Sequence, residues 1–426
     1  MSTVGDQFAA VAVAVLAYRD TGQPALSALV YSISLWAPLV GTPTLGFVAD
    51  RWPRRTVMVA GASVQALLVA AMAVPGVPLS VLAVLLLLAL MVSTPYQAAA
   101  DATLTVAVDP EDYPTAMAIR TTGLETGQLL GLVSAGLLVT TVGAGPVLAA
   151  DAATFALSAI LIAVTGRYRP SVAPRPASRA VQAPSIGVDN VVMGETAVRG
   201  DAPRGRAAPR GRWVAWSIIR DDPQLRSLLW LRLIAGLAVV PEGIAVSLAA
   251  QLGAPWATGL LLMIEPAAVL VGTIVLHAVA DERTRLRLLG PLTVASVAPL
   301  IAVVAGPRWA IVVPALVVAG LAASYHVPAG TRWGQIVPNE YRGRVHALAR
   351  PVLRAVQGAG MAGGGVVAGL AGSATTAIAA AGGLGVLLAI PAAWAWSRAQ
   401  ASSARDQNSR LRTVPTSSSD SDGPVV

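Results

Sequence analysis

The stretch from Thr56 to Ala100 contains no charged side chain, and it limits the possible folds more than any other feature of the sequence. The run is too long for one membrane-spanning helix, which needs about 20 residues. It is interrupted at Pro75-Gly76-Val77-Pro78, a combination typical of a turn. Because lipid offers backbone amides no hydrogen-bond partner, the run predicts two spanning helices joined by a tight loop.

Similar apolar runs recur along the chain and predict an all-α membrane protein with twelve spans. The first span is short, since Arg19 follows 18 residues that include Asp6, which is consistent with a start upstream of Met1. The expected spans lie at about 1–18, 25–49, 57–74, 79–106, 116–141, 147–164, 228–250, 256–279, 288–305, 310–337, 345–370 and 376–396.

Composition supports this fold class and argues against an enzyme. Charged residues make up 12% of the chain, about half the roughly 25% typical of soluble domains. Cysteine is absent, which excludes disulfides, thiolate metal sites and cysteine nucleophiles. The three histidines are not at metal-ligand spacing, and no phosphate-binding loop occurs, so no cofactor and no ATP hydrolysis are expected.

The 30 basic residues, all arginine, lie mostly in loops. Such scatter argues against nucleic-acid binding, which needs a clustered patch on a folded domain. Arginine-rich loops face the cytoplasm, so the bias places both termini inside and leaves only Arg19 and Arg308 outside. The Arg- and Ala-rich composition indicates a multi-pass protein of a bacterial inner (plasma) membrane.

The spans fall into two sets of six, which predicts four regions. Residues 1–166 form an N-terminal six-helix bundle and residues 223–397 a C-terminal one, as in a duplicated transporter. Between them, residues 167–222 form a basic, Pro/Ala-rich cytoplasmic linker without apolar periodicity, and residues 398–426 form a cytoplasmic tail. Both are expected to be disordered.

Two loops carry a family resemblance. Gly46-Phe47-Val48-Ala49-Asp50-Arg51-Trp52-Pro53-Arg54-Arg55 resembles the hallmark cytoplasmic loop of the major facilitator superfamily, with Pro53 in place of the usual second glycine. The segment Val337-Pro-Asn-Glu-Tyr-Arg-Gly-Arg-Val345 resembles the matching loop of the bacterial drug-exporter-like branch. The resemblance extends over most of the chain, from Gly5 to Trp396.

The resemblance implies that the first loop forms a conformational latch of the outward-facing state. Gly46 would allow close helix packing, Asp50 would face the positive end of the helix at 345–370, and Arg54 or Arg55 would pair with Asp101. The alternative is that the arginines only fix topology. The expected latch residues are Gly46, Asp50, Arg51, Arg54, Arg55 and Asp101.

Ionisable residues inside spans are costly in lipid, so each suggests a function unless it forms a structural ion pair. Glu125 and Glu265 lie near mid-span and are the first candidates for proton coupling, with His326 second. The structural alternative pairs Glu125 with Arg120, and Glu265 with Arg350 or Arg354. Asp151 is interpreted as structural.

In members of this family the first, fourth, seventh and tenth spans surround a central cavity. The resemblance therefore implies which residues line it. The substrate-cavity candidates are Asp6, Gln97, Arg232, Glu242 and Tyr325.

Glycines four residues apart, at Gly360 and Gly364 and in the span at 116–141, predict faces for packing and sliding between the halves. The latter span lacks the Gly-Pro of drug antiporters.

These features favour a secondary active transporter that expels a small amphipathic or drug-like compound in exchange for protons by alternating access. Its expected partners are this small molecule, protons and lipid, and it is expected to be a monomer. Two alternatives stay open: a proton-coupled importer of a small metabolite, and a membrane sensor that does not transport.

Overall fold

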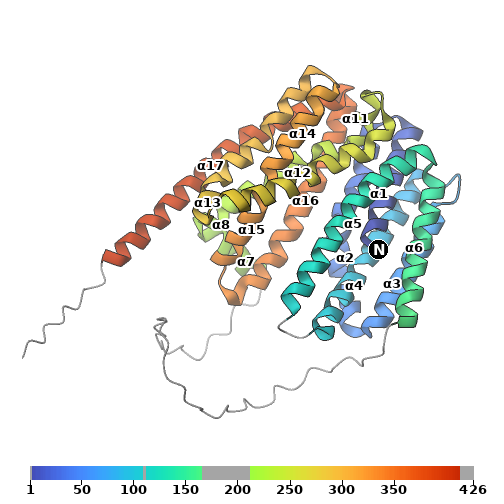
Figure 1. Ribbon diagram of the computed structural model, residues 1–426, viewed down its shortest axis with the longest axis horizontal. Coiled ribbons are helices and arrows are strands. Elements are labelled where there is room, and N and C mark those ends of the chain that lie inside the picture. The colour runs from blue at the N-terminus through green and yellow to red at the C-terminus, as the bar shows by residue number, and fades with distance from the viewer. Residues whose placement is uncertain (1, 109–111, 166–211, 413–426) are drawn as a thin grey trace, which may run out of the picture.

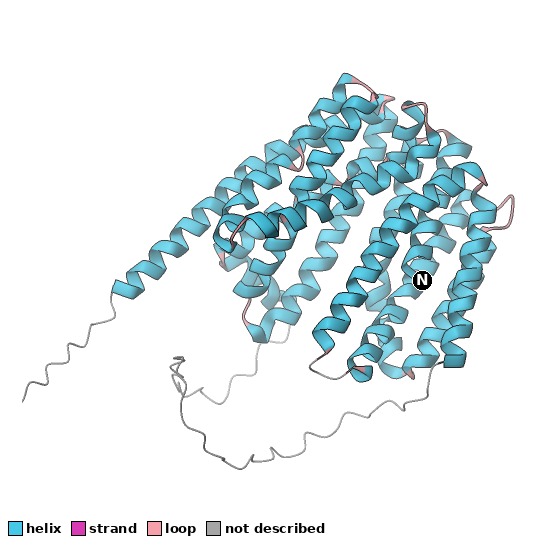
Figure 2. Cartoon of the chain, viewed as in Figure 1, coloured by secondary structure: helices cyan, strands magenta, loops and turns pink. Residues whose placement is uncertain are grey.

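The computed structural model describes residues 2–108, 112–165 and 212–412, and every regular element within these ranges is a helix (Figure 2). The first half of the chain forms a bundle of long helices (Figure 1). These are α1 (Ser2–Thr21), α2 (Pro24–Arg51), α3 (Arg54–Met72), α4 (Leu79–Ala107), α5 (Tyr113–Thr141) and α6 (Ala144–Thr165). The turn expected at Pro75 to Pro78 separates α3 from α4, with Gly76 at φ 82°.

The second half contains shorter segments. It begins with α7 (Arg212–Asp221), α8 (Pro223–Leu233), α9 (Ala235–Ala238), α10 (Val240–Gly243) and α11 (Ala245–Gln251). The 3₁₀ turn η1 (Pro255–Ala257), α12 (Thr258–Val279), α13 (Glu282–Ala295) and the 3₁₀ helix η2 (Ala298–Ala305) follow. The chain continues through α14 (Trp309–Ala323), α15 (His326–Ile336), α16 (Asn339–Ala371) and α17 (Ala374–Arg412).

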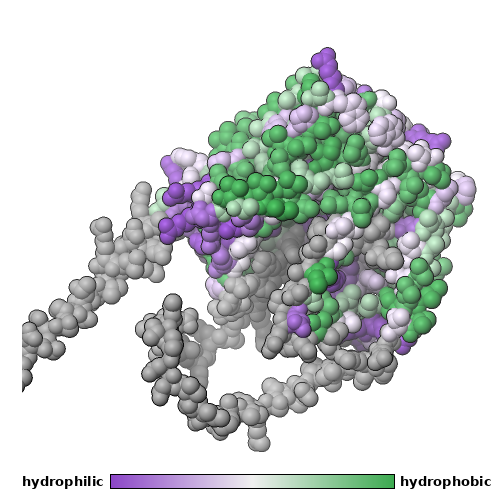
Figure 3. Space-filling model, in the orientation of Figure 1, coloured by the Kyte–Doolittle hydropathy of each residue, from purple (hydrophilic) through white to green (hydrophobic). Residues whose placement is uncertain are grey.

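The predicted all-helical membrane fold is confirmed. Within the described ranges, nine helical segments are long and apolar enough to cross a bilayer. The other three expected spans correspond to α1, α5 and α16, and the apolar part of α5 runs from Thr126 to Thr141. Figure 3 shows the resulting apolar surface (green) over much of the visible face, with hydrophilic residues gathered near the beginning of α13. The chain is therefore a multi-pass membrane protein.

The span expected as one helix at 228–250 is broken into α8, α9, α10 and α11. Proline has no amide hydrogen, and Pro241 lies in the first turn of α10. The Glu242 amide donates to the carbonyl of Val239, three residues back instead of four. The span at 310–337 breaks in the same way, since the Tyr325 amide donates to the Ala322 carbonyl. Such tightened turns leave carbonyl groups outside the regular helical pattern.

Two helices extend into regions expected to be disordered. Helix α7 lies at the end of the segment interpreted as linker. Its Ile219 is buried in one cluster with Leu225 and Leu228 of α8. Helix α17 continues past the expected end of the last span at 396 to Arg412. The linker residues 167–211 and tail residues 413–426 lie outside the described residues.

Asp222 caps α8, since its carboxylate accepts hydrogen bonds from the amides of Gln224 at 2.7 Å and Leu225 at 3.1 Å. Replacing an aspartate cap with alanine removes these acceptors and costs about 0.5–2 kcal/mol. Asp222→Ala should therefore lower the apparent melting temperature of the purified protein in detergent. Asp221→Ala is the matched control, because this neighbour forms only an exposed ion pair with Arg220. Equal melting of the two variants would contradict the capping role.

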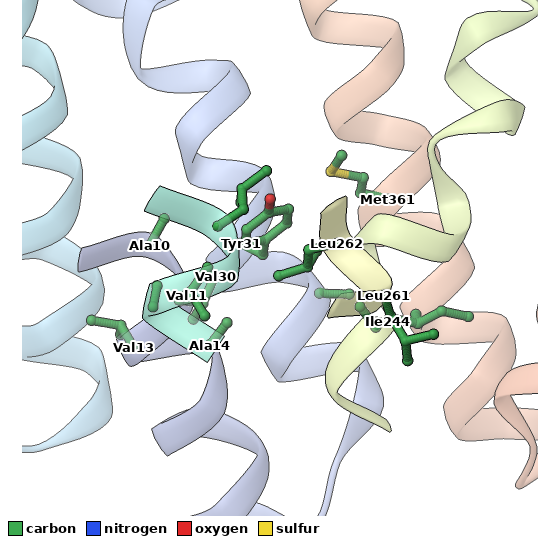
Figure 4. Close-up of a cluster of buried hydrophobic side chains, with 14 of the residues drawn as sticks. Ala10, Val11, Val13, Ala14, Val30, Tyr31, Ile244, Leu261, Leu262 and Met361 are labelled. Carbon is green, nitrogen blue, oxygen red and sulfur yellow. The ribbon is translucent and has the colours of Figure 1, made fainter. Parts of the chain in front are cut away.

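The two halves are joined by apolar packing. Helix α2 packs on α16 and α5 packs on α12. In Figure 4, Tyr31 of α2 lies toward Leu262 of α12, with Met361 of α16 alongside, and all three belong to one buried apolar cluster. These apolar side chains form the hydrophobic contact between the two halves, whereas the outer surfaces of both halves face lipid.

Glycines set how closely the halves approach. A Cβ atom on Gly136 of α5 would lie 2.1 Å from the Gly259 nitrogen of α12. A Cβ on Gly365 of α16 would lie 2.4 Å from the Cβ of Ala28 of α2. Both contacts lie toward the end of the molecule that carries Arg19. The halves are therefore in backbone contact at that end.

The prediction that Gly360 and Gly364 of the 345–370 span pack against the other half is wrong. Gly360 and Gly364 pack against Gly236 and Val240, which belong to the same half. Contact with the other half falls instead on Gly365 and on Gly358, whose added Cβ would meet the Trp36 indole. The difference is one of helix rotation, which spacing along a single helix does not fix.

Candidate functional site

Two glutamates of the second half interact electrostatically inside the protein. Glu265 of α12 has 9% of its surface exposed, and its carboxyl group interacts electrostatically with that of Glu242 on α10. Arg354 of α16 interacts with Glu242, as does the Tyr31 hydroxyl of α2. We call these four residues the glutamate cluster; it joins residues from both halves at their interface.

The local structure explains how Glu242 reaches this position. It lies on the one-turn helix α10, flanked by Val239 and Ile244, which do not have helical dihedral angles. Gly243 allows this turn to approach α16, because a Cβ there would lie 2.7 Å from the Cβ of Met361. The break places Glu242 on a one-turn helix, where its carboxyl group interacts electrostatically with Glu265 and Arg354.

The sequence predicts Glu265 as a proton-coupling residue and Glu242 as a cavity residue, and the structure brings the two together. Of the two arginines proposed as alternative partners of Glu265, Arg354 interacts with Glu242. The side chain of Arg350 lies outside the described residues. Tyr31 carries no charge and was not a candidate, because spacing gives no indication that α2 reaches the glutamates.

A second group forms where α14 gives way to α15. Tyr325 donates a hydrogen bond to the Leu231 carbonyl at 2.9 Å, and its ring lies 4.2 Å from that of His326, centroid to centroid. Arg232 of α8 interacts electrostatically with both residues. Tyr325 has no exposed surface, so in this conformation it ties α8 to the α14–α15 break and does not line an open cavity.

The third group belongs to the first half. The fully buried Gln65 of α3 donates to the Asp6 carboxylate of α1 at 3.2 Å and to the Ala89 carbonyl at 3.3 Å. The carboxyl groups of Asp6 and Asp151 interact electrostatically. Asp6 therefore lies inside the first bundle with Gln65 and Asp151, apart from the glutamate cluster. Gln65 was not a candidate, although an amide within an apolar span is a signal that could have found it.

Two further candidates are not brought to these groups by any described contact. Gln97 lies on an exposed face of α4. The side chain of Glu125 on α5, and with it the expected pairing with Arg120, lies outside the described residues.

The expected latch has different contacts. Arg54 donates to the Ala102 carbonyl at 2.6 Å, and Arg55 donates to the Ala163 carbonyl. Asp101 pairs instead with Arg120 of α5, at 2.5 Å between Nη2 and Oδ1. The predicted pairing of Arg54 or Arg55 with Asp101 is therefore wrong here, because Arg120 of α5 forms the ion pair with this carboxylate.

The remaining latch residues are less engaged. A Cβ on Gly46 would meet nothing within 4 Å, so the expected close packing at this glycine is also wrong in this conformation. Arg51 is exposed, and the Asp50 side chain lies outside the described residues. The two arginines Arg54 and Arg55 nevertheless tie the beginning of α3 to α4 and α6.

Comparison with known proteins follows this geometry. The sequence profile of the Major Facilitator Superfamily matches residues 1–356. No curated protein matches the chain in sequence. Among solved structures, a bacterial homolog of the human lysosomal transporter Spinster, inward-facing and unoccupied, superposes with a TM-score of 0.67 at 13% identity, covering 93% of this chain and 94% of that one.

Two further structures have the same arrangement. The nucleoside transporter NupG gives a TM-score of 0.63 at 14% identity, covering 93% of this chain and 97% of its own. A POT family transporter in complex with a thioalcohol-conjugated peptide gives 0.63 at 9% identity, with 91% and 93% covered. At these identities the likeness shows the fold alone.

Proposed function

Because the chain belongs to the Major Facilitator Superfamily and is built as a membrane transporter, we propose that it is a secondary active transporter that expels a small amphipathic compound in exchange for protons. The observation that carries this proposal is the glutamate cluster. Carboxyl groups buried beside each other suit proton uptake and release, since each charge changes the cost of ionising the other. Arg354 and Tyr31 place this chemistry where the halves meet, so that protonation and movement of the halves are coupled.

We further propose an orientation and a state. The arginine-rich loops face the cytoplasm of a bacterium, both termini are inside, and the units 1–166 and 223–397 rock against each other as a monomer. The backbone contacts between Gly136 and Gly259 lie at the opposite end. They support a conformation that is closed toward the outside.

Export of a drug-like compound rests on the resemblance of the two loops to the drug-exporter-like branch, together with the mixed charges of Arg232, Glu242 and Glu265 inside the second half. Import of a small metabolite is the second candidate, and one observation bears on a metabolite as substrate. The solved structures of similar fold include a nucleoside transporter. A sensor that does not transport would bind ligand without proton-dependent flux.

Reconstituted vesicles test the proposal. With purified protein in liposomes and an imposed pH gradient, we expect a fluorescent hydrophobic dye to move against its concentration gradient, and collapse of the pH gradient by an uncoupler to stop it. Comparison of the medium of cells with and without the gene would then identify the natural compound. Dye movement that is identical in protein-free liposomes and unaffected by the uncoupler would reject export.

The loop between α2 and α3 gives a separate prediction. If Asp50 acts as a latch against α16, Asp50→Asn should abolish transport and leave the amount of protein in the membrane unchanged. Asp112→Asn is a matched control, because this exposed aspartate precedes α5 without capping it. Transport at the wild-type rate in Asp50→Asn would leave the arginines of this loop with a role in topology alone.

A further inference from the structure

A polar cavity of about 210 Å³ lies in the second half, where the end of α12, the beginning of α13 and α15 come together. Sites for drug-sized ligands begin at roughly 300 Å³, so this cavity suits a compact chemical group. The lining residues used below are His277, Glu282, Arg285, Thr331, Arg332 and Gln335.

Two arginines line this cavity without a carboxylate partner. In the part of the chain that the structure describes, neither Arg285 nor Arg332 forms an ion pair. Glu282 is the acid among the lining residues, and its carboxylate accepts a hydrogen bond from the Gln335 amide at 3.4 Å. Positive charge therefore exceeds negative charge in the lining.

The hydrogen bonds of the two guanidinium groups leave nitrogens for a ligand. Arg332 of α15 donates from Nη2 to the Gln224 side-chain oxygen at 3.0 Å, and this neutral amide does not offset its charge. The Nε of Arg285 is buried without a partner among the described residues, so only the terminal nitrogens of this side chain can serve a ligand in the cavity. Guanidinium groups match the geometry of phosphate oxygens. The cavity therefore favours a phosphate group.

The cavity lies next to a surface that faces lipid. Leu270, Ile274 and His277 have helical spacing on one face of α12, and all three are exposed. The first two, which we call the apolar strip, lead to His277 in the cavity lining. Figure 3 shows apolar surface (green) meeting hydrophilic residues (purple) near the beginning of α13. A phosphate in the cavity would thus lie at the boundary between hydrocarbon and water.

We propose that this cavity binds the phosphate group of an anionic phospholipid. The phosphate would accept hydrogen bonds from Arg285 and Arg332, and an acyl chain would lie along the apolar strip. A soluble phosphate offers the same charge but gains nothing from the strip, whereas a lipid matches both features. Basic cavities at the surface of a membrane are typical sites for lipid head groups. The inference does not depend on the direction or the coupling of transport.

Native mass spectrometry of the purified full chain tests this proposal. The protein in detergent, stripped of bound lipid, would be titrated with phosphatidylglycerol and separately with phosphatidylcholine. We expect one tightly bound phosphatidylglycerol and about 10-fold weaker binding of phosphatidylcholine, whose choline group cancels the phosphate charge. Arg285→Gln should weaken phosphatidylglycerol binding by about 10- to 100-fold, as expected for loss of hydrogen bonds to a charged group.

Two further variants separate the site from general effects. Arg287→Gln is the matched control, because this exposed arginine lies on the same helix and does not line the cavity. It removes one surface charge and should weaken binding by no more than about 5-fold. Thr331→Trp fills the cavity, keeps both arginines and should abolish binding, which decides the matter if Arg285→Gln fails to fold. Equal losses in Arg285→Gln and Arg287→Gln, unchanged binding in Thr331→Trp, or equal binding of the two lipids would overturn the proposal.

Glycerol 3-phosphate distinguishes a lipid from a soluble phosphate. Added in about 100-fold excess over phosphatidylglycerol, it should leave the bound lipid in place, because it has no acyl chain to bury. Displacement of the lipid would overturn the proposal and indicate a site for a soluble phosphate compound.

Discussion

Replacing Gly136 with leucine is expected to separate the two halves at the Arg19 end and to reduce transport severely. Any side chain at this position meets the backbone of α12, since even a Cβ would lie 2.1 Å from the Gly259 nitrogen. The reverse contact is equally tight, because a Cβ on Gly259 would lie 2.6 Å from the Leu132 carbonyl oxygen. Backbone atoms on both sides leave no flexible group to move aside. The closed contact must therefore open.

The expected size of this effect follows from the cost of overpacking. Inserted carbon atoms in a packed interface cost about 1–3 kcal/mol, and a bias of that size changes a two-state population by about 5- to 150-fold. Transport that requires both states should slow by a similar factor. The protein should still accumulate in the membrane, because the other contacts of α5 with α1 are unaffected.

Distance measurements can check this prediction, since the natural chain has no cysteine. Spin labels on Val142→Cys, just after α5, and on Trp256→Cys within η1, both exposed positions, should report a longer distance in Gly136→Leu. Gly123→Leu is the matched control on the same helix, where an added Cβ meets nothing within 4 Å. If both leucine variants gave the wild-type distance and rate, close contact at Gly136 would not matter for the cycle.

The sequence allowed the helical segments to be located because lipid imposes a simple rule. Charge-free runs, the Pro75 to Pro78 turn and the arginine-rich loops each follow from the cost of exposing polar groups to hydrocarbon. The breaks around Pro241 and Tyr325 were not predicted. Membrane helices often accommodate proline with only a kink, so Pro241 alone does not indicate a one-turn helix. Helix α7 was missed because its apolar face is short and becomes visible only through its contact with α8.

The site could be predicted only in part, for a related reason. The mid-span position of its charge singled out Glu265, and the family resemblance added Glu242 and Arg232 as cavity residues. Which charges meet depends on helix rotation and crossing, and this explains why Asp101 pairs with Arg120 and not with Arg54. The uncharged Gln65 gave a weaker signal, although it is central to the first-half group.

Neutralising Glu265 should have the largest effect on coupling. Glu265→Gln keeps the shape and removes both the charge and the titratable proton, so proton-driven accumulation of dye in liposomes should fall to the protein-free level. Downhill exchange of dye should continue, because the amide still fits between α12 and its neighbours. Glu242→Gln should act in the same direction, since the two carboxyl groups interact.

The double variant distinguishes one coupled pair from two independent sites. Residues that act as a unit show strongly non-additive losses, so Glu242→Gln combined with Glu265→Gln should be no worse than either single change. Glu282→Gln at the beginning of α13 is the control, because this exposed acid contacts only Gln335 among its described hydrogen bonds. Full proton-driven flux in both single variants would remove the glutamate cluster from the mechanism. Loss of downhill exchange as well would instead make these residues part of the substrate pathway, since proton coupling alone is not needed for exchange down a gradient.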